Sequence, residues 1–170
     1  MAKKILLHTA LWHKPKINKI KSWRAKLVMI YLLSNPKVSR TGIYIIFSEE
    51  IASGIGRDVI DAEQAREAIK ELELTGLIKY EHVADIVYII NINQYGSVDS
   101  GRPDIVAKEI LDDFNDLDRE NKMVMQFWLD YVQINQEELK ALNDNATKCK
   151  YNKTSITLQP ILDLFLPKKN

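Results

Sequence analysis

The spacing of apolar and polar residues over positions 22–92 predicts three helices and three short strands. The first helix is expected over 22–33, where apolar residues recur every three or four positions and Ser22 can cap the start. The Asn35–Pro36 pair ends this helix, because the residue before a proline avoids the helical conformation. The predicted apolar stripe comprises Trp23, Leu27, Val28, Ile30 and Tyr31. The β-branched and aromatic run at 42–47 is typical of a buried strand.

A short helix and a longer one follow this strand. The short helix is expected to begin with Ser48 as its cap and to end at Gly54–Gly56. The longer helix begins after Asp61, whose spacing to Gln64 suits a reciprocal cap, and it ends before Gly76. Its predicted apolar stripe comprises Ala65, Ala68, Ile69 and Leu72.

Two further strands complete this part of the chain. They are predicted over 77–81 and 86–92, with a short turn at 82–85 between them. The order helix, strand, helix, helix, strand, strand is the connectivity of a winged helix-turn-helix domain. We therefore expect such a domain over residues 1–95, including a basic N-terminal arm.

The rest of the chain is predicted to be helical. Residues 96–102 are rich in Gly and Ser and are expected to form a linker. A small α-helical C-terminal module is then expected over 103–170, with Pro103 in the first turn of its first helix and a polar loop at 143–155. The apolar positions of its predicted helices include Val106, Ile110, Phe114, Leu117, Met123, Val124, Phe127, Trp128, Tyr131, Val132, Leu139, Leu142, Ile161, Leu162, Phe165 and Leu166. The predicted fold class is α+β and mostly helical.

The composition is that of a globular protein. Of the 170 residues, 46% are hydrophobic and 28% are charged, which excludes a wholly disordered chain. No apolar run approaches the roughly 18 residues that a membrane span needs, and the first residues do not form a signal peptide. We expect a soluble, cytoplasmic protein without membrane contact. The one cysteine, Cys149, excludes an internal disulfide and a Cys-based zinc site, and we interpret it as an ordinary thiol in a loop.

Charge is distributed unevenly along the chain, although the net charge is only +1. Residues 1–40 contain ten Lys or Arg and no Asp or Glu, whereas residues 41–139 contain eight basic and 21 acidic residues. A segment of this kind favours contact with a polyanion. The alternative is that it pairs with the acidic middle of the same chain.

Several short motifs in residues 10–81 occur together in a known family. They are Trp12 before Lys16–Ile17, the "AKL…YLL-NP" run at 25–36, the "GIY-I" run at 42–46 and the EQAREAIKELELTGLIKYE segment at 63–81. This combination resembles the N-terminal winged-helix domain of phage replisome organisers and DnaD-like replication initiators. The resemblance implies a role in starting DNA replication, through binding of origin DNA or recruitment of a replicative helicase or its loader.

The N-terminal arm supplies the first set of candidate DNA contacts. Its cations are Lys14, Lys16, Lys19, Lys21, Arg24 and Lys26. They are interleaved with Trp12 and Trp23, so the arm could follow a sugar–phosphate backbone and offer rings for stacking on unpaired bases. The alternative is that both tryptophans lie in the core, with Trp23 on the apolar stripe, and that only the cations face solvent.

The predicted helix at 61–75 supplies the second set. Winged helices usually place this helix in the major groove, where Gln64, Arg66 and Lys70 could contact bases or phosphates. The same helix carries five Asp or Glu against two Arg or Lys, which is unfavourable next to phosphates. The alternative is an ordinary solvated face, and we expect the arm to provide most of the DNA affinity.

Neither catalysis nor a cofactor is predicted. His8, His13 and His82 are isolated and lack metal-ligand spacing, and no phosphate-binding loop is present in the sequence. An acidic group lacks the glycine and terminal Glu of a calcium loop, and it comprises Asp112, Asp113, Asp116, Asp118 and Glu120. We expect this group to be a solvated face or a face that contacts a basic partner, and we do not expect an enzyme.

The C-terminal module is a candidate for protein contacts. Phe127, Trp128 and Tyr131 are expected to bind a replisome protein or a second copy of the chain, because leftover apolar surface on a small module often forms an interface. The alternative is that these side chains pack in the core. Two other functions stay open: an interaction module with little DNA affinity, and a transcriptional regulator with the same fold.

Overall fold

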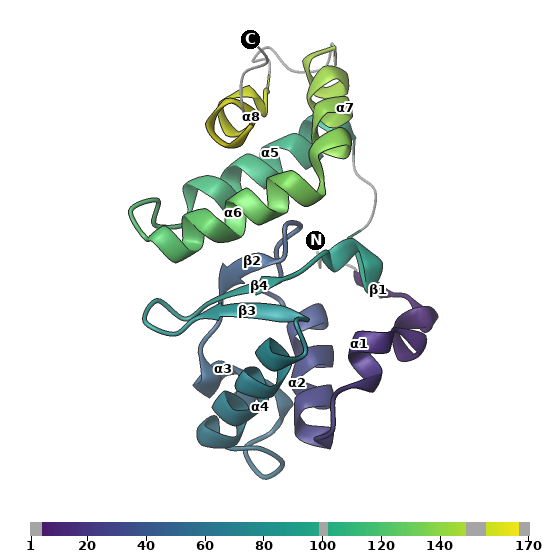
Figure 1. Ribbon diagram of the computed structural model, residues 1–170, viewed down its shortest axis with the longest axis vertical. Helices are drawn as coiled ribbons and strands as arrows, with labels where there is room; N and C mark the ends of the chain where they lie inside the picture. The colour runs from purple at the N-terminus through teal and green to yellow at the C-terminus, as the bar shows by residue number, and fades with distance from the viewer. Residues whose placement is uncertain (1–4, 99–101, 149–155, 167–170) are drawn as a thin grey trace. The chain divides into compact units, whose positions relative to one another are not determined.

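Three helices cover one face of an antiparallel sheet in the N-terminal part of the protein (Figure 1). The helices are α2 (Trp23–Ser34), α3 (Ser48–Ile55) and α4 (Ala62–Leu74). The strands are β2 (Ile43–Ile45), β3 (Ile78–Glu81) and β4 (Ile86–Ile89), in the order β2-β4-β3. The wing is the β3–β4 hairpin, in which Lys79 pairs with Tyr88 and Glu81 with Ile86. The predicted winged-helix connectivity and the α+β, mostly helical class are confirmed.

The computed structural model describes residues 5–98, 102–148 and 156–166. The chain divides into two units, residues 1–99 and 100–170. None of the helices in the described ranges is both long enough and apolar enough to cross a bilayer.

The N-terminal unit contains a second, smaller sheet that was not predicted. Strand β1 (Ile5–Leu7) pairs with β5 (Gly96–Val98), so the N-terminal half of the predicted linker is a strand. The other short elements are η1 (Thr9–His13), α1 (Pro15–Asn18) and η2 (Ile92–Gln94). The linker prediction was wrong for 96–98 because the partner strand, β1, is far away in sequence, near the start of the chain. Local composition does not reveal such a pairing. Residues 99–101 of that predicted linker lie outside the described range.

Helix α2 begins as predicted but buries a different face. The Ser22 hydroxyl accepts hydrogen bonds from the main-chain N–H groups of Arg24 and Ala25. The buried residues are Ala25, Val28, Met29, Leu32 and Leu33, which share only Val28 with the predicted stripe. Apolar residues surround most of this helix, so their spacing does not single out one face. Packing of α2 against α3 and α4 determines which face is buried.

The Asn–Pro pair and the following glycine connect α2 to the sheet. Asn35 is buried, and its Nδ2 donates to the Tyr44 hydroxyl at 2.9 Å and to the Leu32 carbonyl at 3.0 Å. Gly42 has a φ of +75°, and a Cβ at this position would lie 2.9 Å from the Ile89 carbonyl oxygen. Glycine is therefore required where β2 approaches β4.

The two ends of α4 match the prediction, whereas the start of α3 differs from it. Asp61 accepts a hydrogen bond from the Gln64 N–H at 2.8 Å, and the Gln64 side chain accepts one from the Asp61 N–H. All four predicted stripe residues of α4 are buried, and Gly76 has the positive φ of a residue after a helix end. In α3, Ser48 is the first helical residue and Phe47 precedes the helix, because the Glu50 carboxylate accepts from the Phe47 N–H.

The C-terminal unit consists of four helices, as far as its described residues extend. They are α5 (Pro103–Asn115), α6 (Lys122–Ile134), α7 (Gln136–Thr147) and α8 (Gln159–Phe165). Phe114 joins three of them, with ring centroids 5.0 Å from Trp128 and 6.1 Å from Phe165. Helix α7 continues through the first part of the predicted loop because Asn143 is buried and accepts from the Leu158 N–H at 2.7 Å. Residues 149–155, including Cys149, lie outside the described ranges.

Candidate nucleic-acid interface

The basic segment, defined here as residues 14–26, runs from the start of α1 into the first turn of α2. Its cations are Lys14, Lys16, Lys19, Lys21, Arg24 and Lys26, and the segment contains no carboxylate. Lys16, Lys19, Lys21 and Lys26 are exposed, while Lys14 and Arg24 are half-buried. The first candidate set thus lies on one continuous stretch of chain and is exposed or half-buried, while Ile17, Ile20 and Ala25 of the same segment are buried.

One of these lysines also contacts the rest of the domain. Lys16 Nζ donates a hydrogen bond to the Gly76 carbonyl at 2.7 Å, which ties α1 to the turn between α4 and β3. The Lys21 N–H donates to the Glu71 carboxylate at 2.6 Å. Helix α4 thus positions the basic segment, and Lys16 is less free to contact a phosphate than Lys19, Lys21 or Lys26.

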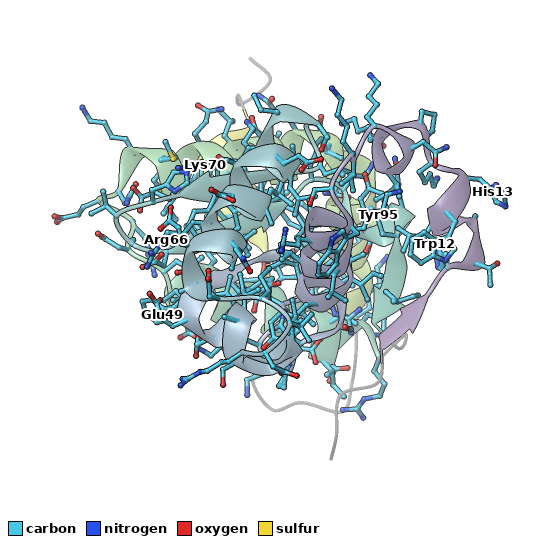
Figure 2. The ribbon with its side chains drawn as sticks, turned by 90° about the horizontal axis from the view of Figure 1, so that it is seen from below. Trp12, His13, Glu49, Arg66, Lys70 and Tyr95 are labelled. Carbon is cyan, nitrogen blue, oxygen red and sulfur yellow. The ribbon has the colours of Figure 1, made fainter. Side chains whose placement is uncertain are left out.

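Both tryptophans of the arm lie at the surface. Trp12 is 52% exposed and Trp23 is 54% exposed, so the alternative that placed them in the core was wrong. The Arg24 guanidinium carbon lies 4.8 Å from the centre of the Trp23 ring, within cation–π range. Figure 2 shows Trp12 and His13 at one edge of the N-terminal unit, away from Glu49, Arg66 and Lys70.

The candidate base-reading residues of α4 are mostly engaged within the protein (Figure 2). Arg66 forms ion pairs with Glu49 of α3 and with Glu63, and Gln64 takes part in the helix cap. Hydrogen bonds from its own main-chain N–H and from the Ser48 hydroxyl lower the pKa of the Glu49 carboxyl, so it is anionic near neutral pH. Lys70 is exposed. The structure places the second set on one helix, with two of its three members already bonded.

The wing adds little positive charge to this surface. Its turn, residues 82–85, contains no Arg or Lys. His82 Nε2 lies 3.0 Å from a Glu73 oxygen, and the other oxygen of Glu73 accepts from the Tyr80 N–H at 3.1 Å. The wing turn is therefore connected to α4 by a carboxylate. Val83 at its tip is 91% exposed.

The predicted partner-binding side chains of α6 are buried. Phe127 and Trp128 are each 1% exposed, and Tyr131 is 6% exposed. The Trp128 ring packs edge-on against Phe114 and Tyr131, with centroids 5.0 and 5.6 Å away. These contacts favour the alternative in which the three residues are core. Met123 on the same helix is exposed.

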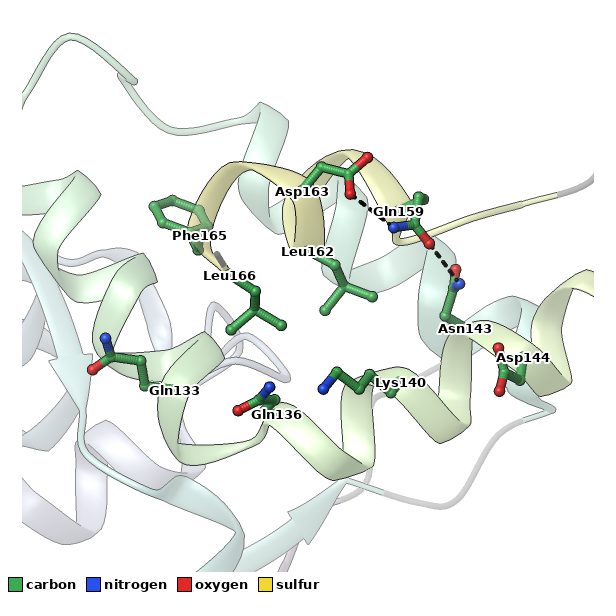
Figure 3. Close-up of a pocket in the computed structure, with 10 residues that line it drawn as sticks. All are labelled: Gln133, Gln136, Lys140, Asn143, Asp144, Gln159, Leu162, Asp163, Phe165 and Leu166. Carbon is green, nitrogen blue, oxygen red and sulfur yellow. Dashed lines mark hydrogen bonds between the residues drawn. The ribbon is translucent and has the colours of Figure 1, made fainter. Parts of the chain in front are cut away.

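A pocket of about 620 Å³ lies between α7 and α8 in the C-terminal unit (Figure 3). Figure 3 shows Gln136 and Lys140 of α7 facing Leu162 of α8 and Leu166, the residue that follows α8. At one end, Asn143 donates to the Gln159 side chain at 3.4 Å. Among the described residues no group of three or more His, Cys, Asp or Glu side chains could hold a metal ion. The pocket thus has mixed polar and apolar walls without a recognisable catalytic arrangement.

The chain was also compared with known proteins. No protein family, curated protein or solved structure with which the chain was compared matches it.

Proposed function

We propose that this chain is a DNA-binding protein that contacts the phosphate backbone with its basic segment and acts in the initiation of replication. The observation that carries the DNA-binding part is the set of lysines at positions 14–26, all exposed except the half-buried Lys14, in a stretch of 40 residues without a carboxylate. Neutralisation of phosphates by Lys and Arg supplies most of the sequence-independent affinity of DNA-binding proteins. The replication part rests on the resemblance of residues 10–81 to replisome organisers.

In this proposal α4 contributes little to DNA affinity. Insertion of α4 into a major groove would bring Glu63 and Glu67 towards phosphates and would require Arg66 to leave its two carboxylate partners. A bidentate Arg–guanine contact typically supplies about 1–3 kcal/mol of discrimination. We therefore expect Arg66→Ala to weaken binding much less than changes in the basic segment do.

A salt titration of the full chain with duplex DNA tests the proposal. The test variant replaces Lys14, Lys19, Lys21 and Lys26 with Gln and leaves Lys16 in place, because Lys16 has a structural hydrogen bond. If all four contact phosphates, the slope of log affinity against log salt concentration should become less negative by roughly 3 to 4. The control replaces four exposed lysines of the C-terminal unit, Lys108, Lys122, Lys140 and Lys148, with Gln. An unchanged slope in the test variant, or an equal change in the control, would contradict the proposal.

A second candidate function is protein contact through α4 and the wing. Leu74 at the end of α4 is 89% exposed, and Val83 at the wing tip is similarly exposed. Exposed apolar side chains next to carboxylates suit a protein partner better than a phosphate backbone. This function would be favoured if the chain binds a replicative helicase or its loader and if Leu74→Ser and Val83→Ser weaken that binding. Such binding would also distinguish a role in replication from a role in transcription.

A further inference from the structure

Two large aromatic rings are exposed next to the basic segment. Trp12 and Trp23 each expose more than half of their surface, whereas Trp128 is buried. Leaving such rings in water costs hydrophobic free energy that burial would recover. The exposure at both positions, only 11 residues apart in the chain, therefore needs an explanation.

The stretch of chain that joins the two rings is cationic. Between them lie Lys14, Lys16, Lys19 and Lys21, and Arg24 lies over the ring of Trp23. The guanidinium lies against that ring, and 54% of the Trp23 surface is still exposed for a second partner. Arg24 Nε is buried and has no hydrogen-bond partner among the described residues, so ring contact is the interaction that the structure records for this guanidinium.

This combination is more consistent with an unpaired nucleic-acid strand than with a protein or a duplex. A protein partner would need many carboxylates to match the lysines. In a duplex the bases are already stacked on one another, so the flat faces of the rings would have no equivalent partner. An unpaired strand offers both groups that this surface complements: phosphates for the lysines and base faces for the indoles.

We infer that Trp12 and Trp23, with the guanidinium of Arg24, form a stacking site for bases of an unpaired DNA strand whose phosphates lie along the basic segment. This inference rests on the proposed function, because the same lysines hold the backbone. It extends that function to opened DNA, in which single strands are exposed.

Intrinsic fluorescence provides the first test on the full chain. Only three tryptophans are present, and one of them is buried, so the fluorescence change on binding reports on Trp12 and Trp23. Titration with a single-stranded oligothymidylate of about 15 nucleotides, a length within the usual site range, should quench this signal. A duplex of the same length should bind with much weaker quenching.

Substitutions provide the second test. Trp12→Ala and Trp23→Ala should each weaken oligothymidylate binding by roughly 5- to 150-fold, and affinity for the duplex should be almost unchanged. Trp12→Phe and Trp23→Phe keep a stacking face and should restore most of the affinity. The control is Phe47→Ala, since Phe47 is an exposed aromatic residue with Lys37 near its ring but lies outside the basic segment. Its substitution should leave binding of both DNAs unchanged.

The outcomes separate this inference from the proposed function. If the wild type binds neither DNA in a salt-dependent way, the proposed function is wrong. If duplex binding depends on salt as expected while the Ala variants, folded by circular dichroism, bind oligothymidylate like the wild type, the stacking site alone is wrong. Equal loss of duplex and single-strand binding in the Ala variants would also overturn the stacking site, because it would indicate a structural role for the rings.

Discussion

The carboxylate of Glu71 accepts a hydrogen bond from the main-chain N–H of Ser22, with 3.0 Å between oxygen and nitrogen. The same oxygen accepts from the Lys21 N–H. Glu71 lies on α4 and Ser22 caps α2, so one side chain joins the two helices where the basic segment enters α2. A carboxylate next to the first N–H groups of a helix also interacts favourably with the helix dipole.

We expect Glu71→Ala to destabilise the protein by about 1–2 kcal/mol, because two main-chain donors lose a charged acceptor. Urea unfolding measures this change. Glu67→Ala, one turn earlier on the exposed face of α4, is the control and should change stability by less than about 0.5 kcal/mol. DNA affinity of Glu71→Ala at low salt should not decrease, since the substitution removes a negative charge beside the lysines. Equal stability of the two variants would show that the hydrogen bonds to Glu71 contribute nothing.

Local signals were sufficient to predict most of the winged-helix domain. Ser22, the Asp61–Gln64 pair and Gly76 mark helix ends through hydrogen bonds or backbone conformations that involve only a few neighbouring residues. The strand β5 and the buried face of α2 could not be predicted in this way. Both depend on segments far away in the chain: β1 for the strand, and α3 and α4 for the helix.

The residues of the candidate interface could be predicted from the sequence, but their contacts with the rest of the domain could not. The lysines of the basic segment and their lack of acidic neighbours are visible in the sequence. The partner of Lys16 and the second partner of Arg66 are not, because Gly76 lies 60 residues from Lys16 and Glu49 lies 17 residues from Arg66. These contacts weaken the case for α4 as the principal DNA-binding element. The exposure of Trp23 was also missed, because its spacing alone fits a buried stripe.

Two glycines with positive φ should respond differently to substitution. Gly42→Ala and Gly76→Ala each introduce a side chain into the left-handed region, at a cost of roughly 1–2 kcal/mol. At Gly42 the new Cβ would also lie 2.9 Å from the Ile89 carbonyl oxygen, whereas at Gly76 the nearest atom is the flexible Lys16 Nζ at 3.6 Å. We expect Gly42→Ala to lower the unfolding free energy clearly more than Gly76→Ala in urea unfolding. Equal effects would mean that β2 shifts away from β4 at little cost.

Substitution of Trp128 should lower the stability of the fold rather than weaken self-association. Its burial against Phe114 and Tyr131 predicts that Trp128→Ala opens a cavity and costs about 3–5 kcal/mol. The measurement is thermal unfolding at a concentration where sedimentation shows a monomer. Trp128→Phe should lose less stability than Trp128→Ala. Met123→Ala on the same helix should lose little stability because Met123 is exposed. Weaker self-association with an unchanged melting temperature would instead support the earlier prediction that Trp128 is an interface anchor.

Stability should decrease at alkaline pH because of Tyr44. Burial raises the pKa of the Tyr44 hydroxyl above its ordinary value of about 10, and this hydroxyl donates to the Leu32 carbonyl at 2.6 Å. The unfolded chain releases this proton above about pH 10 while the folded chain keeps it, so the free energy of unfolding decreases as pH rises. The contribution is fully present below pH 10 and is lost by up to about 1.4 kcal/mol per pH unit above it.

Urea unfolding at pH 9 and pH 11 tests this pH dependence. The wild type should lose about 1.4 kcal/mol more than Tyr44→Phe between the two pH values, because the variant lacks the titrating group. Comparison with the variant cancels the effects of other groups that ionise in this range. Absorbance of the folded wild type at pH 11 should show no tyrosinate signal from Tyr44 until the protein unfolds. Equal loss of stability in the wild type and Tyr44→Phe between pH 9 and pH 11 would contradict this prediction. It would mean that the Tyr44 hydroxyl ionises in the folded protein as readily as in the unfolded chain, in spite of its burial and its hydrogen bond to Leu32.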